Sequence, residues 1–315
     1  MPTRVRSLSL LALLALLVVP AAARAQTDPK FQYGKWEEVK EVKVVEWKAS
    51  AKIGFLLSTG NAQSGSGALG ASVSRKANGN KFALDGGWTY AHSRALQAAD
   101  ANGNGTIEPW EMQRVDQTTA NAWNIRARYD RFFTPNNSGY LVGFAIGDTP
   151  AGKQVVGGGQ IGYSRQLYQS KRHEAAVEAG YDFSYENYVN GTSVNIHSLR
   201  LFTGYNLKVT NNAGLFANLE ALFNLNSENV PIDQSGNTGA GAFQDTRLTF
   251  KAGLSSTFFK KLSIAIIFNV KYDNVPAPRP AFNINSASVP FAAGFTPLAN
   301  KTDTITEAAL IYSFF

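Results

Sequence analysis

A series of short segments in which apolar and polar residues alternate constrains this chain more than any other feature. The segments 177–186, 215–224 and 262–273 show the alternation most clearly. In an extended strand, successive side chains point to opposite faces, so each segment has one apolar face and one polar face. A tilted strand that crosses a membrane needs about ten residues, which is close to the length of these segments. The series therefore predicts the strands of a transmembrane β-barrel.

The alternating segments predict twelve strands. They span residues 47–60, 66–76, 81–93, 120–133, 139–147, 154–168, 173–188, 194–208, 214–226, 245–258, 262–273 and 302–315. Short connections alternate with longer ones, as they do in outer-membrane barrels with short periplasmic turns and longer extracellular loops. A soluble antiparallel sheet with one wet face would share the alternating residues, but not the alternating loop lengths. We therefore expect an all-β fold, a closed antiparallel transmembrane β-barrel of about twelve strands over residues 47–315.

The first 25 residues have the three regions of a secretory signal peptide. Arg4 and Arg6 precede an apolar run from Leu8 to Val19, and Ala23-Arg24-Ala25 is a small-x-small cleavage site. A soluble amino-terminal helix is the alternative interpretation. We expect residues 1–25 to be removed, residues 26–46 to form a periplasmic lead-in, and the barrel to cross the bacterial outer membrane many times.

The composition narrows the possible partners. The chain contains no cysteine, and a closed barrel needs no disulfides because closure itself removes the free sheet edges. The formal net charge of +7 includes three arginines of the signal segment, which leaves 27 − 23 = +4 on the rest of the chain. This modest excess, spread along the sequence, is weak support for a nucleic-acid partner. We expect contacts with outer-membrane lipid, lipopolysaccharide and the barrel-assembly machinery, and no nucleic acid. The oligomeric state stays open.

One insertion, within 94–119, matches the calcium-loop pattern D-x-[DN]-x-[DN]-G-x5-E of an EF-hand without a gap. The predicted ligands are Asp100, Asn102, Asn104, Thr106, Glu108 and Glu111. Gly105 would supply the sharp turn that brings these oxygens round one cation. Short helices at 93–99 and 109–115 would flank the loop. We predict a weak Ca²⁺ site, with a dissociation constant on the order of 10⁻⁴ to 10⁻³ M, on the extracellular side. A solvated Asn/Gly-rich loop is the alternative.

A second constellation consists of charged residues on the polar faces of the predicted strands, which should point into the lumen. These residues are Lys52, Asp85, Arg126, Arg128, Glu178, Asp182, Glu186, Arg200, Glu220, Lys251 and Lys271. They would form either a salt-bridged filling or a narrow channel for ions or small solutes, since twelve strands enclose less space than a sixteen-stranded porin. The mixture of signs argues against strong ion selectivity. Either way, we expect a structural or passive role.

Aromatic residues are predicted to mark both membrane interfaces, as they do in barrel girdles. The expected belts contain Phe132, Phe133, Tyr140, Tyr168, Phe258, Phe314 and Phe315 near the short turns, and Trp88, Tyr90, Trp123, Tyr185, Tyr188 and Tyr272 near the long loops.

An enzyme is the main alternative class, because outer-membrane phospholipases use a serine and a histidine. This chain has the pairs His92-Ser93 and His197-Ser198. Adjacent residues of a strand point to opposite faces, so the two members of one pair cannot meet. We therefore expect no enzymatic activity. A surface adhesin or receptor, based on the long connection 274–301, is a further alternative.

Several stretches resemble one bacterial family. Gly54-Phe-Leu-Leu-Ser-Thr-Gly-Asn61, Tyr129-Asp-Arg-Phe132, Gly159-Gln-Ile-Gly-Tyr163 and the ending 304–315 are similar to the YdiY-like family, domain-of-unknown-function family 481. The resemblance implies an outer-membrane barrel and supplies no catalytic residues. Relatives usually finish on tyrosine-serine-phenylalanine, whereas this chain adds one more phenylalanine. The assembly signal is therefore expected at Tyr312 with Phe314 or Phe315.

Overall fold

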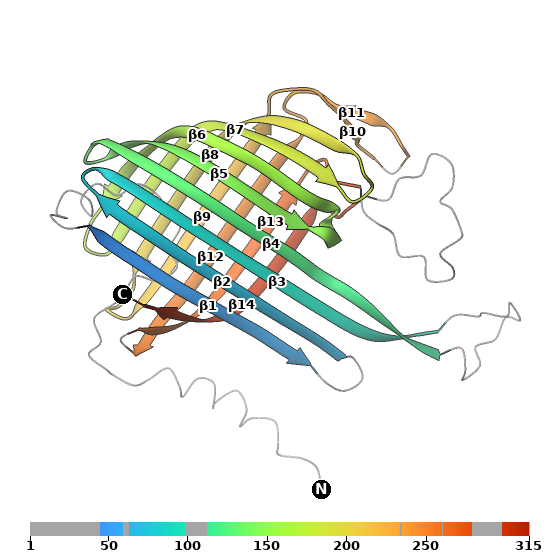
Figure 1. Ribbon diagram of the computed structural model, residues 1–315, viewed down its shortest axis with the longest axis horizontal. Coiled ribbons are helices and arrows are strands. Elements are labelled where there is room, and N and C mark those ends of the chain that lie inside the picture. Colours follow the sequence, from blue (N-terminus) through green and yellow to red (C-terminus); the bar gives the residue numbers. More distant parts are fainter. Residues whose placement is uncertain are drawn as a thin grey trace, which may run out of the picture.

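The computed structural model describes residues 45–58, 63–98, 112–233, 235–259, 261–278 and 298–314. Its main element is a closed barrel of antiparallel strands (Figure 1). The barrel strands are β1 (Glu46–Ser58), β2 (Gln63–Ala77), β3 (Asn80–Ala98), β4 (Met112–Thr134), β5 (Asn137–Asp148), β6 (Lys153–Gln169), β7 (His173–Tyr188), β8 (Ser193–Lys208), β9 (Ala213–Asn224), β12 (Thr246–Phe259), β13 (Leu262–Asp273) and β14 (Thr302–Ser313). The predicted fold class is confirmed.

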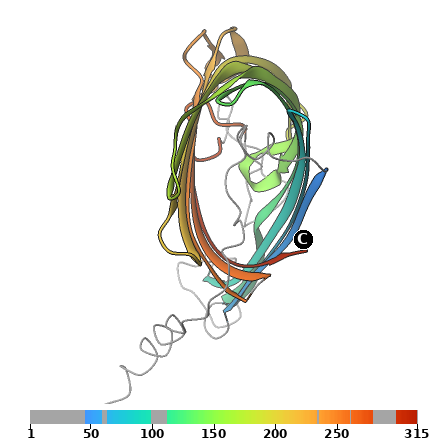
Figure 2. The same ribbon diagram turned by 90° about the vertical axis from the view of Figure 1, so that its left-hand side faces the viewer.

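The barrel closes where the first strand meets the last. β1 pairs with β14 from Ser50 to Ile53, whereas it pairs with β2 along its whole length. Gly54 lies so close to β14 that a Cβ there would sit 3.0 Å from the carbonyl oxygen of Ala308. Figure 2 shows the resulting ring of strands, which is flattened rather than circular. Closure joins the first strand to the last, so that neither is a free edge strand, as a membrane requires of a sheet.

The two ends of the barrel differ in their connections. Residues 78–79, 135–136, 170–172, 209–212 and 260–261 connect strands at one end, which we call the short-turn end. Asn78 and Gly79 both have positive φ, as a two-residue hairpin turn requires. Both described ends of the barrel chain also lie there. The opposite, long-loop end carries longer connections, including 225–245 and 274–301. The rule for outer-membrane barrels predicts that the short-turn end faces the periplasm.

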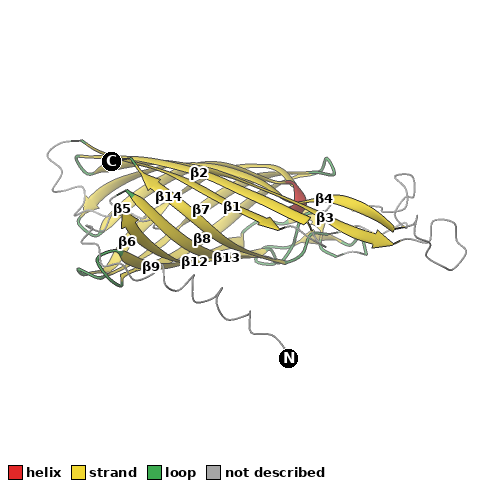
Figure 3. Cartoon of the chain, turned by 90° about the horizontal axis from the view of Figure 1, so that it is seen from below, coloured by secondary structure: helices red, strands yellow, loops and turns green. Residues whose placement is uncertain are grey.

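The segment around the predicted calcium loop differs from expectation. β3 continues to Ala98 and β4 begins at Met112, and these two residues are register partners. The helices predicted at 93–99 and 109–115 are therefore wrong over their described residues. The ladder of β3 and β4 already satisfies the backbone groups there, and a helix would have to break it. Figures 1 and 3 show the two strands projecting beyond the rest of the barrel.

Three smaller elements lie at the long-loop end. A 3₁₀ turn, η2 (Thr149–Ala151), connects β5 to β6, and the strands β10 (Glu228–Pro231) and β11 (Thr238–Ala240) form a hairpin between β9 and β12. Within the described residues, no helix is long and apolar enough to cross a membrane.

The outward face of the strands is apolar. Large side chains such as Leu69, Leu141, Ile161, Leu254 and Ile266 are exposed around the barrel wall. Such a band is what a lipid bilayer covers.

Three residues predicted for the aromatic belts point into the barrel rather than toward the lipid. Phe132, Tyr140 and Tyr188 are each 5% exposed or less and belong to the interior, so their placement in the belts is wrong. Tyr140 shares its face of β5 with Ser138 and Val142, which are also buried. An aromatic side chain is compatible with both the lipid side and the lumen side of the barrel wall. Its position in the alternation of the strand decides which side it faces.

Candidate functional site

The candidate site is the barrel lumen. The structure places the charges predicted for the lumen inside the barrel, where they are either buried or line a cavity. These residues are Lys52, Asp85, Arg126, Arg128, Glu178, Asp182, Glu186, Arg200, Glu220, Lys251 and Lys271. They do not form one continuous lining, because some belong to two compact networks at different heights and others face the space between those networks.

We call the network nearer the short-turn end the inner tier, formed by Arg128, Asp130, Tyr140, Glu178, Arg200 and Glu220. The guanidinium of Arg128 donates to Asp130 (2.7 and 3.0 Å) and to Glu178 (2.7 and 3.1 Å). Arg200 donates to Glu178 (2.8 Å), to the Tyr140 hydroxyl (2.9 Å) and to Glu220. Because β4 and β7 are separated in the sheet by β5 and β6, the bond from Arg128 to Glu178 joins strands that are not neighbours in the wall.

Two glycines make room for the aromatic member of the inner tier. A Cβ at Gly162 or Gly180 would lie 2.5 Å from the Tyr140 hydroxyl oxygen. The Tyr140 ring in turn lies under the guanidinium of Arg128, whose Cζ is 4.5 Å from the ring centroid. This cation–π contact holds the arginine against the ring while its nitrogens bond the carboxylates.

The rest of the short-turn half of the lumen is also filled. Phe216, Ala265, Ile267 and Ile311 form a buried apolar cluster on β9, β13 and β14. Other inward side chains on the remaining wall are buried as well, including Ala83, Ser138, Ser164, Ala176 and Ser255. Arg200, at the centre of the inner tier, is 1% exposed. Water therefore does not reach Arg128, Asp130, Tyr140, Glu178 or Arg200, whereas the Glu220 side chain is 24% exposed.

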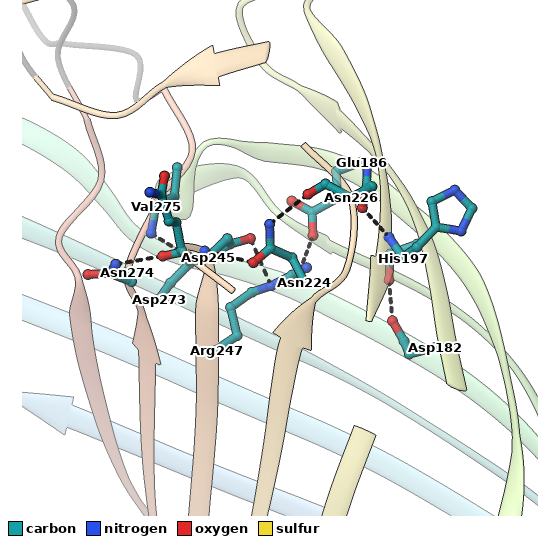
Figure 4. Close-up of polar contacts among 12 residues, drawn as sticks. Asp182, Glu186, His197, Asn224, Asn226, Asp245, Arg247, Asp273, Asn274 and Val275 are labelled. Atoms are coloured by element: carbon teal, nitrogen blue, oxygen red, sulfur yellow. Dashed lines mark hydrogen bonds and ion pairs between the residues drawn. The ribbon is translucent and has the colours of Figure 1, made fainter. Parts of the chain in front are cut away.

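A second network, the outer tier, lies near the long-loop end and consists of Lys153, Glu186, Asp245, Arg247 and Asp273. Arg247 on β12 donates to Glu186 on β7 (2.7 Å), and Lys153 on β6 lies 3.3 Å from Asp273 on β13. Strands β6 and β13 are separated by four others, so this ion pair joins facing walls. Figure 4 shows Arg247 between Glu186 and Asp245. Lys271 and Asp148 approach to 3.8 Å across the same region.

An apolar cluster covers part of the lumen at the long-loop end, and we call it the roof. It contains Tyr188, Val194, Ile196, Val230, Ala240 and Ala277. The Asn224 side chain fixes the roof to the wall, because its oxygen accepts from the Asp245 amide and its nitrogen donates to the carbonyls of Asn226 and Gly241 (2.9 Å each; Figure 4). Gly152 packs so tightly against Pro278 that a Cβ would meet its carbonyl oxygen at 2.2 Å.

Two carboxyl groups lie beneath the roof without full hydrogen bonding. Glu228 and Asp245 are 3% and 2% exposed, and one oxygen of each has no partner among the described residues. Burial raises the pKa of Glu228 to about 7, and the nearby charge of Asp245 adds to this rise. Burial also raises the pKa of Asp245 to about 7, although Arg247 opposes it. Both groups therefore titrate near neutral pH.

Cavities lie between the two tiers and beside them. One, of about 380 Å³, is lined by residues that include Asp85, Arg126, Gln160, Asp182, Glu220 and Lys271. Arg126 donates to Gln160 (3.2 Å), which donates to Asp182 (2.9 Å). A second, of about 570 Å³, is lined in part by Lys52, Lys251, Lys271 and Glu307. Lys52 and Glu307 pair at 2.9 Å. The lumen is thus packed at the short-turn half and hollow nearer the loops.

Sequence reasoning missed several members of these networks. Arg247 and Glu307 lie on strands at the inward phase, so the alternation contained the signal that would have identified them. Asp245 and Glu228 lie in a connection without a repeating pattern. No sequence signal indicated that this connection folds back over the lumen.

The structure does not bring the serine and histidine pairs together. Ser198 is fully buried on the inward face of β8, whereas the His197 ring points outward and bonds the Tyr181 hydroxyl. His92 on β3 lies 3.7 Å from Asp116, and four strands separate β3 from β8.

The predicted calcium ligands Asp100, Asn102, Asn104, Thr106, Glu108 and Glu111 lie outside the described residues. Among the residues that are described, no group of three or more Asp, Glu or His side chains is arranged to hold a metal ion. At the carboxyl end, Tyr312 and Phe314 are exposed and stack edge to face at 5.1 Å. Phe315 is outside the described part of the chain.

A closed antiparallel barrel with an apolar outer wall and a charged interior defines an outer-membrane β-barrel protein. The sequence profile of one family, described as "Protein of unknown function, DUF481", matches residues 51–314. The chain belongs to this family, as its resemblance to the YdiY-like sequences predicted.

Solved structures with similar folds are distant in sequence. The NanC porin is 8% identical, with a TM-score of 0.43 over 84% of this chain and 98% of its own. The translocator domain of the autotransporter NalP from Neisseria meningitidis is 13% identical, with a TM-score of 0.39 over 88% and 91%. OmpT of Vibrio cholerae is 9% identical, with a TM-score of 0.36 over 86% and 97%. No curated protein sequence matches the chain significantly.

Proposed function

We propose that this protein is a structural component of the outer membrane whose barrel has no standing pore. The observation that supports this proposal is the inner tier, in which two bonds join non-neighbouring strands: Arg128 on β4 bonds Glu178 on β7, and Arg200 on β8 bonds Tyr140 on β5. All four side chains are less than 5% exposed. An ion that crossed the barrel would have to displace these charge-assisted bonds, which are stronger than ordinary hydrogen bonds.

Conductance across a planar lipid bilayer tests this proposal. Refolded wild-type protein is expected to give no stepwise current in long recordings. The double variant Tyr140→Ala, Arg200→Ala removes two large buried side chains of the inner tier, which meet from β5 and β8, and is expected to give measurable current steps. Regular steps from the wild-type protein would contradict the proposal.

A narrow passive channel is the second candidate, and the two cavities near the long-loop end favour it. They are lined by both signs of charge, which suits small solutes of either sign. Stepwise currents from the wild-type protein that show little preference between cations and anions would support this function in place of the structural one.

We also propose that the insertion between β3 and β4 binds Ca²⁺. The support is the complete ligand pattern from Asp100 to Glu111, together with the pairing of Ala98 and Met112, which brings the two ends of the insertion side by side. The ion would stiffen an extracellular loop or link it to a neighbouring molecule such as lipopolysaccharide.

Calorimetric titration of refolded protein with Ca²⁺ is expected to show one site with a dissociation constant on the order of 10⁻⁴ to 10⁻³ M. Glu111→Gln removes the bidentate ligand and should abolish the heat signal. Asp116→Asn, an acid on β4 outside the pattern, is the matched control and should leave it unchanged. Equal Ca²⁺ binding by the wild-type protein and by Glu111→Gln would contradict the assignment of this site.

A further inference from the structure

The short-turn end of the barrel carries exposed charge of one sign. Seven exposed cationic side chains lie on its last strand residues and turns, and we call this set the basic rim. Its members are Arg75, Arg131, Arg165, Lys171, Arg172, Lys208 and Lys261. The exposed acidic side chains of the described residues, Asp116 and Asp303, lie toward the other end, where they pair in register with Arg94 and Lys271. Exposed cations also lie at the long-loop end, at Lys271 and Lys301, and Asp303 lines a lumen cavity. The short-turn end differs in that its fully exposed charges are all positive.

The basic rim is not neutralised by the residues that the structure describes. Within the described part of the chain, none of its members forms an ion pair. Glu46, at the start of β1, is partly exposed but pairs with Lys48, and other acids near this end are drawn inward. Asp130, for example, is 1% exposed and bonds Arg128 in the inner tier. Arg131 donates to the neutral Asn80 side chain and Lys261 to a backbone carbonyl. The charges of the basic rim are thus left for an external partner.

Three members of the basic rim face the lipid rather than the aqueous phase below it. Arg131 lies between Tyr129 and Phe133 on the outward face of β4, and both aromatic rings are exposed. Arg165 follows the exposed Tyr163 in the same way on β6. Exposed aromatic residues of this kind mark the level of the headgroups. An arginine one outward position away reaches that level with its guanidinium, since long cationic side chains extend toward the interface.

The third lipid-facing member of the basic rim is Arg75 on β2. It is the register partner of Trp47 on β1, and the Trp47 ring is 51% exposed on the outer wall. The indole and the guanidinium therefore stand side by side at the same height of the barrel. This places a natural fluorophore beside one of the proposed contacts.

From these positions we infer that the basic rim binds the phosphates of anionic phospholipids in the membrane leaflet at the short-turn end. A guanidinium matches a phosphate through paired hydrogen bonds, and its positive charge is attracted to an anionic leaflet. The lipid-facing direction of Arg75, Arg131 and Arg165 favours a headgroup over a soluble polyanion. This contact would fix the depth and tilt of the barrel, independently of whether the lumen conducts.

Fluorescence quenching by brominated lipids tests the inference. In the refolded full-length protein, the four other tryptophans are replaced by phenylalanine so that Trp47 reports alone. Brominated phosphatidylglycerol is expected to quench Trp47 at about one-fifth of the mole fraction that brominated phosphatidylcholine requires, the preference one interfacial cation would give. Arg75→Gln should bring the ratio close to one. Lys301→Gln, at the long-loop end, is the matched control and should leave it unchanged.

Equal quenching by the two lipids in the wild-type background would overturn the inference. A preference that survives both Arg75→Gln and the triple variant Arg75→Gln, Arg131→Gln, Arg165→Gln would also overturn it, because the selectivity would then come from elsewhere. Co-sedimentation with purified peptidoglycan, combined with no lipid preference, would assign the basic rim to the cell wall instead.

Discussion

Replacing Arg128 with alanine is expected to lower the free energy of unfolding by about 3–5 kcal/mol, the cost of leaving a buried charge without its partner. Its guanidinium supplies bonds to both Asp130 and Glu178, which are 1% and 4% exposed. Both carboxylates would stay in the packed lumen after the change, and only Glu178 would keep an arginine, Arg200. Urea unfolding of the refolded protein in detergent micelles or lipid vesicles measures the loss.

Arg131→Ala provides the control for this experiment. Arg131 lies on the same strand but points outward and is exposed, so its loss is expected to change the free energy of unfolding by no more than about 0.5 kcal/mol. Adding Asp130→Ala to an Arg128→Met variant removes one of the stranded charges and should restore part of the stability. Equal losses for Arg128→Ala and Arg131→Ala would show that the inner tier does not stabilise the barrel.

The roof is expected to loosen as the pH rises through about 7, because Glu228 and Asp245 are held beneath it with raised pKa values. In the closed roof, Glu228 and Asp245 keep their protons to a higher pH than they do in the open loop. The stability that this difference gives the closed roof is fully present below pH about 4, where the two carboxyls are protonated in both states. That stability is lost as the pH rises through the folded pKa values. With two carboxyls involved, the opening constant can rise by at most about 100-fold per pH unit.

The charged groups around these two carboxyls come from four barrel strands. Arg247 on β12 and Lys153 on β6 favour ionisation, whereas Glu186 on β7 and Asp273 on β13 oppose it. Burial outweighs the two cations, since both pKa values are raised. The direction of the pH effect is therefore fixed by desolvation rather than by the surrounding charges.

Cysteine labelling measures the opening directly, because the chain has no cysteine of its own. Val230→Cys places a thiol in the buried roof, and Ser235→Cys places one on the exposed connection as a reference for the intrinsic effect of pH on the thiol. The ratio of the two labelling rates should rise from pH 5 to pH 8. Glu228→Gln combined with Asp245→Asn should flatten that rise, and an unchanged slope would rule out the two carboxyls as its cause.

The strands were predictable because every strand that crosses the membrane follows one rule, in which apolar residues that face the lipid alternate with polar residues that face the lumen. The predicted bounds of β7 and β13 agree with the structure at both ends, since the apolar outer face and the polar inner face persist to the last residue. The rule stops applying beyond the bilayer. β3 and β4 continue as paired strands past the apolar band, so their extension and the absence of the flanking helices could not be predicted from alternation.

The interior was predictable in its charges but not in its connections. Phase along each strand identifies Arg128, Glu178 and Arg200 as inward residues, but it does not reveal that they bond one another inside the lumen. That arrangement depends on the flattened section and on the space that Gly162 and Gly180 leave for Tyr140. The roof depends on loops whose packing against Tyr188 and Ile196 follows no sequence period.

The short junction between β1 and β14 bears on how the barrel is made and how it would fail. Four consecutive residues, Ser50 to Ile53, pair across it, and the Lys52–Glu307 ion pair adds a side-chain link between the same two strands. Fewer backbone bonds hold this junction than any of its neighbours along the wall. We expect it to be the last contact made during insertion and the first to part under lateral tension, so that the wall would unzip there toward the lipid.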